Sequence, residues 1–285
     1  MLVFAVLVAG SYSLGGMAAS HISPAAINIV RFAVGITVMA TAVALVMRGH
    51  IPAPRAPWRY LVLGMLMAVF FITMFVSLRL TTPVATGAVF TLMPLLSAVF
   101  GYFLLREAPR GVVWASLVFA GLGAVWVIFR GDLDAIVAFD IGLGETIFLA
   151  GVIAHSIYAP LIKKLYDDRE PLVAFTLWTL VATGLCITVY GAGDLFTTDW
   201  STLPPIVWVA IIYLAVMTTA GTTFLVQFSA MHLPAAKVLA YTYLTPGLII
   251  VYEGLLGHGW ANLSVLAGAL VTVLGLVVMA FSADD

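Results

Sequence analysis

Charged side chains are scarce in this chain of 285 residues. Asp, Glu, Lys and Arg make up 9% of it, whereas 63% of the residues are hydrophobic. A water-soluble domain of this length needs much more polar surface, so the composition predicts a membrane protein. The formal net charge of −1 comes from charges scattered over short loops. There is no basic patch of the kind that binds nucleic acid, so we expect a lipid bilayer and a small molecule as the partners.

Cysteine pairs, nucleotide motifs and metal-ligand spacings are also lacking. The single cysteine, Cys186, lies in an apolar run and can form no internal disulfide. No glycine-rich loop ends in Gly-Lys before Ser or Thr, which disfavours ATP-driven transport by this chain alone. The five histidines show no metal-ligand spacing. No nucleophile has a base beside it on a helix. We therefore expect no cofactor, no metal and no catalytic residues.

One acidic turn keeps an enzyme hypothesis open. The residues from Asp167 to Glu170 include three carboxylates, as an integral membrane enzyme acting on a lipid-borne substrate would need. A solvated turn between two membrane spans explains the same residues more simply. The enzyme therefore stays the weaker hypothesis.

Long apolar runs fill most of the sequence. Divided at charged, Gly or Pro breaks, they give about ten segments near the ~20 residues that a helix needs to cross a bilayer. The first segment follows no basic residues, so we interpret it as a span and not as a secretory signal. We predict an all-α integral membrane protein. Its expected spans are Leu2–Ala19, Ala25–Met47, Trp58–Leu80, Pro83–Leu105, Gly111–Phe129, Leu143–Leu165, Leu172–Gly191, Ile206–Ser229, Ala235–Leu256 and Asn262–Phe281.

Lys and Arg predict the orientation. With a cytoplasmic N-terminus only Arg79 and Arg130 lie in outer loops, which are otherwise acidic. By the positive-inside rule we expect a multi-pass protein of the bacterial inner membrane with both termini in the cytoplasm. The basic residues expected inside are Arg48, Arg55, Arg59, Arg106, Arg110, Lys163, Lys164 and Arg169, and the acidic residues expected outside are Asp132, Asp134, Asp140, Asp194 and Asp199.

Two stretches of the chain repeat one another. PLLSAVFGYFLLREAPRGVVWASLVFAGLGAVWVIF begins at Pro94 and PGLIIVYEGLLGHGWANLSVLAGALVTVLGLVVMAF at Pro246, which places Gly123 opposite Gly275. With five spans in each half, the second copy enters the membrane in the opposite sense. We predict an N-terminal five-helix repeat over residues 1–130 and a C-terminal inverted five-helix repeat over residues 140–285.

A proline interrupts one span in each half. Pro94 lies within the segment that Pro83 opens, and Pro246 within the segment that Pro234 opens. Such a proline kinks a helix, and paired broken helices point to the central site of a transporter. We therefore predict hinges at Pro94 and Pro246. The second segment has one residue more between its prolines, explained equally by a π-bulge or a chance insertion.

These features together resemble a known family. The Arg31-Phe32 pair, the Arg106-Glu107 end of the broken fourth span and the two inverted halves are similar to the EamA-type carriers of the drug/metabolite transporter superfamily, and among these to YddG-type amino-acid exporters. The resemblance implies a basket of ten helices around a central cavity, lined by the first, third, fourth, sixth, eighth and ninth spans. It also implies export of small metabolites by alternating access.

The second half departs from the family pattern after its ninth span. His258 and Gly259 stand where the family usually has an acidic residue, and Glu253 lies within the span. The apolar composition favours neutral or aromatic amino acids as substrates. Multidrug export, or export of another metabolite, is the alternative, and a channel is a third hypothesis. Proton antiport and facilitated diffusion both stay open, as do a monomer and an oligomer.

His155 is the first candidate for a binding residue, because an ionisable side chain in mid-membrane is costly. Tyr158 lies one turn on, and the pair suits a carboxylate, an amine or a proton. Ser11 and Tyr12 hold the corresponding place in the first span. The other candidates for substrate binding, on spans expected to line the cavity, are Phe71, Phe75, Thr86, Phe90, Gln227, Lys237 and Tyr241.

Three further charged residues are given structural roles. Lys237 is expected to reach the cytoplasmic interface, with contact to a substrate carboxylate as the alternative. Glu253 is expected to pair with Arg79 or to stay near the headgroups. Arg31 lies about 10 Å below the outer end of its span. It shares a face with Asn28; an ion pair with Glu145 is one hypothesis, and a structural partner without substrate contact is the favoured one.

Overall fold

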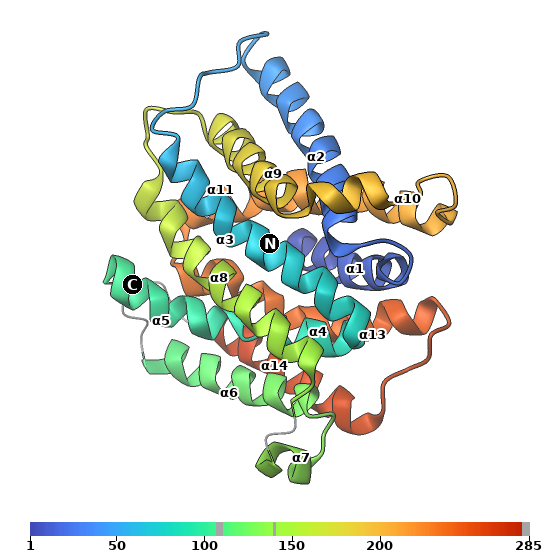
Figure 1. The fold of residues 1–285 in the computed structure, drawn as a ribbon. Coiled ribbons are helices and arrows are strands. Elements are labelled where there is room, and N and C mark those ends of the chain that lie inside the picture. Colours follow the sequence, from blue (N-terminus) through green and yellow to red (C-terminus); the bar gives the residue numbers. More distant parts are fainter. Residues whose placement is uncertain (107–110, 139–140, 281–285) are drawn as a thin grey trace.

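The computed structural model describes residues 1–106, 111–138 and 141–280. Regular secondary structure within these residues is entirely helical, and the helices pack into a basket (Figure 1). Glu107, Arg110, Asp140 and Phe281 lie outside the described residues. So do both ends of the predicted C-terminal repeat, residues 140 and 281–285.

Ten helical segments match the ten predicted spans in the described residues. Nine are long and apolar enough to cross a membrane, and the last is a shorter apolar helix, which confirms the all-α membrane architecture. The segments are α1 (Leu2–Ala19), α2 (Pro24–Val46), α3 (Trp58–Leu80), α4 (Pro83–Phe90) with α5 (Met93–Leu105), α6 (Gly111–Ile128), α8 (Leu143–Leu165), α9 (Leu172–Thr197), α10 (Pro205–Tyr213) with η1 (Leu214–Thr222) and α11 (Thr223–His232), α12 (Ala235–Ala240) with η2 (Tyr241–Leu244) and α13 (Thr245–Leu255), and α14 (Leu263–Ala280).

Two departures from the expected bounds have local causes. α9 continues to Thr197, beyond the predicted end at Gly191, because the chain bends at that glycine (φ −125°, ψ 21°) and then resumes its helix. A short helix, α7 (Leu133–Ala138), lies in the connection between the halves. Large apolar side chains such as Phe103, which is 74% exposed, cover the outside of the basket, as a surface in lipid requires.

Two helices of the N-terminal half, α2 and α4, start with a Ser/Thr-Pro pattern. The Ser23 hydroxyl accepts a hydrogen bond from the Ala26 amide (3.0 Å), and the Thr82 hydroxyl accepts one from the Ala85 amide (3.2 Å). The proline that follows each cap occupies the first helical position, where its missing N–H costs nothing.

Both broken helices restart just before their second proline. In the fourth span, the amides of Thr91 and Leu92 donate to carbonyls three residues earlier, at 3.1 Å each, and α5 then begins with Pro94 as its second residue. Position two of a helix needs no amide donor, so the break accommodates the proline at little cost. The chain therefore replaces a strained kink with a tight turn and a new helix.

The ninth span makes the same adjustment with more residues. η2 is a 3₁₀-helix of four residues, and Pro246 is again the second residue of the next helix. The π-bulge offered for the extra residue is wrong at this place, because the turn before the proline tightens rather than widens. A π-helix occurs instead in the eighth span, as η1.

α6 and α14 pack side by side, and glycines on both helices let their backbones come close (Figure 1). A Cβ on Gly123 would lie 2.8 Å from the Gly268 carbonyl oxygen, and a Cβ on Gly275 would lie 3.0 Å from the Ser116 carbonyl oxygen. In the repeat, Gly275 corresponds to Gly123 and Gly268 to Ser116. The same contact is thus made twice, as a two-fold relation between the two helices requires.

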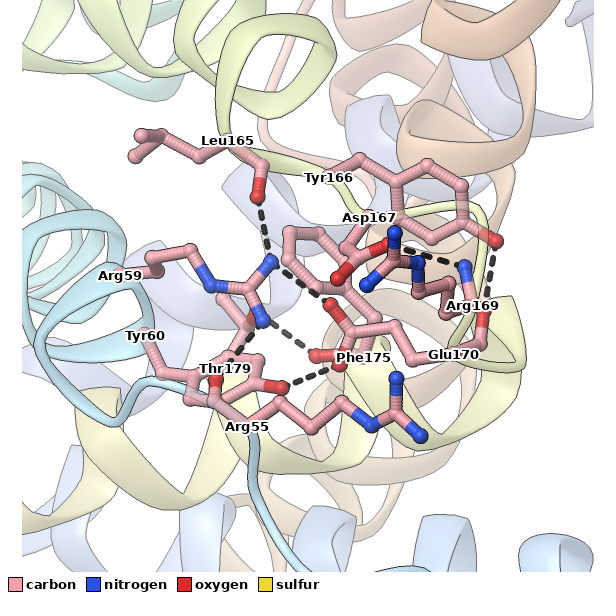
Figure 2. A network of polar contacts seen from close by, with 10 residues as sticks. All are labelled: Arg55, Arg59, Tyr60, Leu165, Tyr166, Asp167, Arg169, Glu170, Phe175 and Thr179. Carbon is pink, nitrogen blue, oxygen red and sulfur yellow. Dashed lines mark hydrogen bonds and ion pairs between the residues drawn. The ribbon is translucent and has the colours of Figure 1, made fainter.

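A buried polar network joins the start of α3 to the segment between α8 and α9 (Figure 2). The Arg59 guanidinium forms an ion pair with Glu170 (2.8 Å) and donates to the carbonyls of Leu165 (2.6 Å) and Arg55 (2.7 Å). The Tyr60 hydroxyl donates to the same Glu170 carboxylate. The network clamps the N-terminal half to the C-terminal half at one end of the basket.

Tyr166 completes this clamp from the other side of the turn. Its hydroxyl donates to the Glu170 carbonyl at 2.8 Å. Burial, together with the nearby carboxylates of Asp168, Glu170 and Asp167, raises the pKa of Tyr166. The hydroxyl therefore keeps its proton and remains a donor.

Glu170→Ala tests the clamp. The change leaves the Arg59 guanidinium buried without its carboxylate, which typically costs about 3–5 kcal/mol, so we expect a clear fall in melting temperature. Tryptophan fluorescence of the purified protein in detergent measures it. Glu253→Ala is the control, because its partner His258 has a side chain that is 41% exposed and such pairs contribute little. Equal melting temperatures for the two variants would contradict a stabilising clamp.

Gly123→Ala tests the close helix contact. The added methyl group meets a backbone oxygen that cannot move aside, so we expect a loss of about 1–3 kcal/mol and less monodisperse protein in size-exclusion chromatography. Gly193→Ala is the matched control, because a Cβ there has nothing within 4 Å. If Gly123→Ala behaved like Gly193→Ala, the contact would not be tight in the membrane protein.

Candidate functional site

A cavity lies between the two halves of the basket. The centres of water molecules can reach about 40 Å³ of it. One water needs roughly 10–15 Å³ by this measure, so the cavity holds a few waters, and a metabolite would require it to widen. Its walls come from α1, α2, α3, α4, α8, η1 and α11. The lining residues are Phe4, Val8, Ser11, Tyr12, Arg31, Met67, Phe70, Phe71, Met74, Phe90, His155, Tyr158, Thr218, Thr222, Thr223 and Val226.

Aromatic rings form much of the cavity wall. Phe70 packs against the His155 ring at 4.6 Å between centroids, and His155 packs against Tyr158 at 5.3 Å. Tyr12 packs against Phe90 at 5.5 Å. The rings come from α1, α3, α4 and α8, so the wall is a joint product of both halves.

Two polar atoms of this wall have no hydrogen-bond partner among the residues that the structure describes. They are the Tyr12 hydroxyl oxygen and the Nδ1 atom of His155, and both are buried. Buried polar atoms in folded proteins are nearly always paired. The cavity that both side chains line is therefore where partners for them would lie.

Arg31 supplies the fixed positive charge of the cavity wall and is 1% exposed. Its Nε donates to the Thr219 hydroxyl (2.6 Å) and one terminal nitrogen donates to the Thr218 hydroxyl (3.1 Å). The other terminal nitrogen is 3.5 Å from the Asn28 side-chain oxygen. The guanidinium carbon lies 4.2 Å from the centre of the Phe71 ring, within the range of a cation–π contact.

The π-helix η1 explains why two consecutive threonines reach one arginine. A π-helix has more residues in each turn than an α-helix, so neighbouring side chains are separated by a smaller angle. Thr218 and Thr219 both lie in η1. Gly35, one turn along α2 from Arg31, allows this approach, because a Cβ there would lie 2.9 Å from the Thr219 methyl group.

Gln227 lies outside the cavity wall and contacts the lining residue Tyr158. Its amide nitrogen donates to the Tyr158 hydroxyl at 3.0 Å, and its amide oxygen accepts from the Thr176 hydroxyl. This amide is fully buried. Gln227 therefore holds Tyr158 in place and is not itself among the lining residues.

The structure brings together six of the eleven predicted binding residues at the cavity: Ser11, Tyr12, Phe71, Phe90, His155 and Tyr158. The other five lie elsewhere. Gln227 is in the layer behind, and Phe75 is fully buried. Thr86 is bonded to Ser77 (3.1 Å) and to the Thr82 carbonyl (3.0 Å).

Lys237 and Tyr241 of the ninth span are not among the described lining residues. Lys237 is half-buried near the start of α12. Tyr241 opens η2 and packs against the apolar cluster around α6 and α14. The 3₁₀ turn places it there, so the ninth span, expected at the cavity, adds no described residue to the wall, whereas the second span adds Arg31.

The hypothesis of an Arg31–Glu145 ion pair is wrong. Glu145 accepts a hydrogen bond from the Thr81 hydroxyl (2.6 Å) at the junction of α3 and α4, whereas Arg31 bonds to the threonines of η1. The suggested Glu253–Arg79 pair is also wrong, since the Glu253 carboxylate contacts His258 at 2.9 Å. Both carboxylates bind partners that lie next to them in the fold. The suggested pairs came from the depth of each residue along its span, and depth alone does not show which side chains are neighbours.

Sequence reasoning missed the threonines of the cavity. Thr218, Thr222 and Thr223 belong to the stretch MTTAGTTF, an unusual concentration of hydroxyls in an apolar span. That concentration was a usable signal. The phenylalanine Phe70 and the methionines Met67 and Met74 carried no such signal, because they look like any other apolar residues of a span.

Gln227→Leu tests the support of Tyr158. The change leaves the buried Tyr158 hydroxyl without its donor, so we expect a loss of about 1–3 kcal/mol of stability, measured as a lower melting temperature. Thr188→Val is the control, because the Thr188 hydroxyl donates to the Gly184 carbonyl of its own helix (2.8 Å). An unchanged melting temperature for Gln227→Leu would show that this layer is dispensable.

Comparison with known proteins shows which proteins this chain is similar to. The curated protein "Uncharacterized transporter YyaM" of Bacillus subtilis (strain 168) is 24% identical over 281 residues, which cover 97% of this chain and 91% of that protein. A solved crystal structure matches with a TM-score of 0.73 and 18% identity, over 98% of this chain and 94% of the other, which shows a shared fold.

The EamA-like transporter family matches residues 1–129 and 142–281, which together are nearly the whole chain. This chain is therefore a multi-pass membrane protein that belongs to the EamA-like transporter family, within the drug/metabolite transporter superfamily.

Proposed function

We propose that this protein is a secondary transporter that exports small metabolites across the bacterial inner membrane by alternating access. The observation that carries the proposal is the cavity between the two halves, which takes lining residues from both. A site enclosed in this way can be exposed to either side when the halves move against each other. A fixed channel would need no such closure.

Neutral and aromatic amino acids are the first candidates for the substrate. The wall combines aromatic rings and methionines with the hydroxyls of Ser11, Tyr12, Thr218, Thr222 and Thr223. Such a surface suits a zwitterion with an apolar side chain better than a phosphorylated compound. The same aromatic surface also suits apolar drugs, so multidrug export is the second candidate within the superfamily.

The two broken helices provide the flexible points. α4 reaches the cavity through Phe90, its last residue, and the chain turns immediately afterwards at Thr91 and Leu92. In the ninth span, η2 separates α12 from α13. Bending at these points would move the segments on either side without unfolding them, and hinges of this kind lie at element ends.

The contacts of the acidic turn disfavour the enzyme hypothesis. Glu170 is engaged in the ion pair with Arg59, and the Asp167 side chain accepts from the Arg169 amide at 3.0 Å. These carboxylates hold a turn and a clamp together. An active site would need them free to bind a metal or a diphosphate.

Counterflow in proteoliposomes tests the proposal. Vesicles with the purified protein are preloaded with an unlabelled amino acid, and uptake of the labelled compound is followed across all amino acids, with nucleosides and cationic drugs in parallel. A secondary transporter gives transient accumulation that saturates with concentration. Uptake without accumulation or saturation would identify a channel, and no uptake of any compound would overturn the proposal.

Pro246→Ala tests the hinge. An alanine lets the helix continue through the break, so we expect the counterflow rate to fall by roughly tenfold because conformational exchange often limits turnover. Pro24→Ala is the matched control, since Pro24 occupies the first position of α2 and breaks no helix. A wild-type rate for Pro246→Ala would exclude a hinge at this proline.

A further inference from the structure

We propose that Arg31 is the anion-binding residue of the cavity and that it receives the carboxylate of the transported substrate. The inference rests on the proposed function, because it concerns the substrate that the protein would transport. It assigns to Arg31 a role in specificity: substrates with one carboxylate bind, and their amides, in which an uncharged group replaces the carboxylate, bind much more weakly.

The first argument is the cost of burying Arg31. An arginine side chain keeps its charge in proteins, and a charge within a membrane span is expensive unless it is paired. No carboxylate of the described residues forms an ion pair with it. Its contacts are two hydroxyls, an amide oxygen and the face of Phe71. These contacts offset part of the cost and leave the positive charge without a counter-charge.

The second argument is the count of donors on Arg31. A guanidinium has five N–H groups. Three are used by Thr219, Thr218 and Asn28, which leaves one N–H on each terminal nitrogen without a hydrogen bond among the described residues. Two donors on one planar group are what a carboxylate can accept together.

The third argument comes from the neighbours of Arg31 in the cavity wall. The Tyr12 hydroxyl and the Nδ1 atom of His155 are buried and have no hydrogen-bond partner in the described part of the chain. Both side chains line the cavity that Arg31 lines. Three polar groups from α1, α2 and α8 therefore meet one space, and each has unused hydrogen-bonding capacity there.

The charge of the wall selects the kind of anion. Among the described lining residues Arg31 is the one with a permanent charge, and the remaining surface is largely aromatic and aliphatic. One positive charge balances a monoanion such as a carboxylate. A phosphate dianion would need a second cation, as sites for phosphate groups usually provide.

The position of Arg31 also links binding to movement. It belongs to α2 in the N-terminal half, whereas Thr218 and Thr219 belong to η1 in the C-terminal half. A carboxylate held by Arg31 would therefore join the contact between the halves. Substrate binding would then change the free energy of moving one half against the other.

Binding measurements with acid and amide pairs test the proposal. The purified protein in lipid nanodiscs is titrated with the twenty amino acids, with short-chain monocarboxylates and with the amides of the compounds that bind, by calorimetry or thermal shift. For the wild type we expect acids to bind at least about 30-fold more tightly than their amides, the size of one charge-assisted contact. Equal affinities, or no binding by any compound, overturn the proposal.

Arg31→Gln removes the charge and keeps hydrogen-bonding groups. We expect this variant to lose the preference for acids, and Arg31→Lys to keep part of it because a charge remains without the planar fork. Thr219→Val is the matched control, since it removes a hydrogen bond of Arg31 while the charge stays. If Arg31→Gln kept the wild-type preference, the proposal would fail. If Arg31→Gln did not fold, the acid and amide pairs on the wild type would still decide.

Sodium chloride tests whether the site binds any small anion. A site for a simple counter-ion would bind chloride, measured against sodium sulfate at equal ionic strength, as tightly as it binds the carboxylates, and this result would overturn the role in substrate recognition. Counterflow separates the two proposals. If Arg31→Gln shows the wild-type counterflow rate and the wild-type preference for acids, the anion site is refuted and the proposal of a transporter stands. If acids bind in a way that depends on Arg31 but no compound gives counterflow, the proposal of a transporter is refuted and the anion site stands.

Discussion

The hydrocarbon of a bilayer offers no hydrogen bonds, and this constraint governs the structure. Every polar group of a span must find its partner within the protein. Threonines inside the spans do so by donating to the carbonyl one turn earlier, as Thr179 does to Phe175 and Thr183 to Thr179, each at 2.8 Å. The same constraint makes the chain turn and restart its helix at Pro94 and Pro246. It thereby places a turn in each of these two spans at little cost.

The constraint is relaxed where the two halves meet. Tyr12 and His155 keep unpaired atoms, and Arg31 keeps an unbalanced charge, at one small cavity. Such exceptions are expensive in a membrane. Other buried polar atoms without a hydrogen-bond partner among the described residues, such as the Ser97 and Thr242 hydroxyl oxygens, lie away from this cavity, so the combination with the Arg31 charge is what distinguishes the proposed site.

The halves are related in sequence but contribute unequally to this site. The two-fold contact between α6 and α14 shows the repeat in three dimensions, with Gly123 and Gly275 in equivalent roles. At the cavity the relation is lost, because the eighth span contains a π-helix and the ninth contains a 3₁₀ turn. Such asymmetry lets a protein with a repeated architecture bind an asymmetric substrate.

The sequence alone determined the ten spans, the internal repeat and the prolines that break two helices. These features depend on hydrophobicity and on residues near in the chain, which a pattern records. It also pointed to His155, Tyr158 and Tyr12, because polar groups stand out in apolar segments.

Only the tertiary structure decided which partners those polar groups have. The Arg31–Thr219 bond, the Arg59–Glu170 clamp and the Tyr158–Gln227 contact join residues far apart in the chain. The rotation of each helix about its axis sets these contacts, and a π-helix or a 3₁₀ turn changes that rotation for every residue beyond it. Helix rotation leaves little trace in a span that is apolar on all sides, since lipid and protein core both accept such a surface.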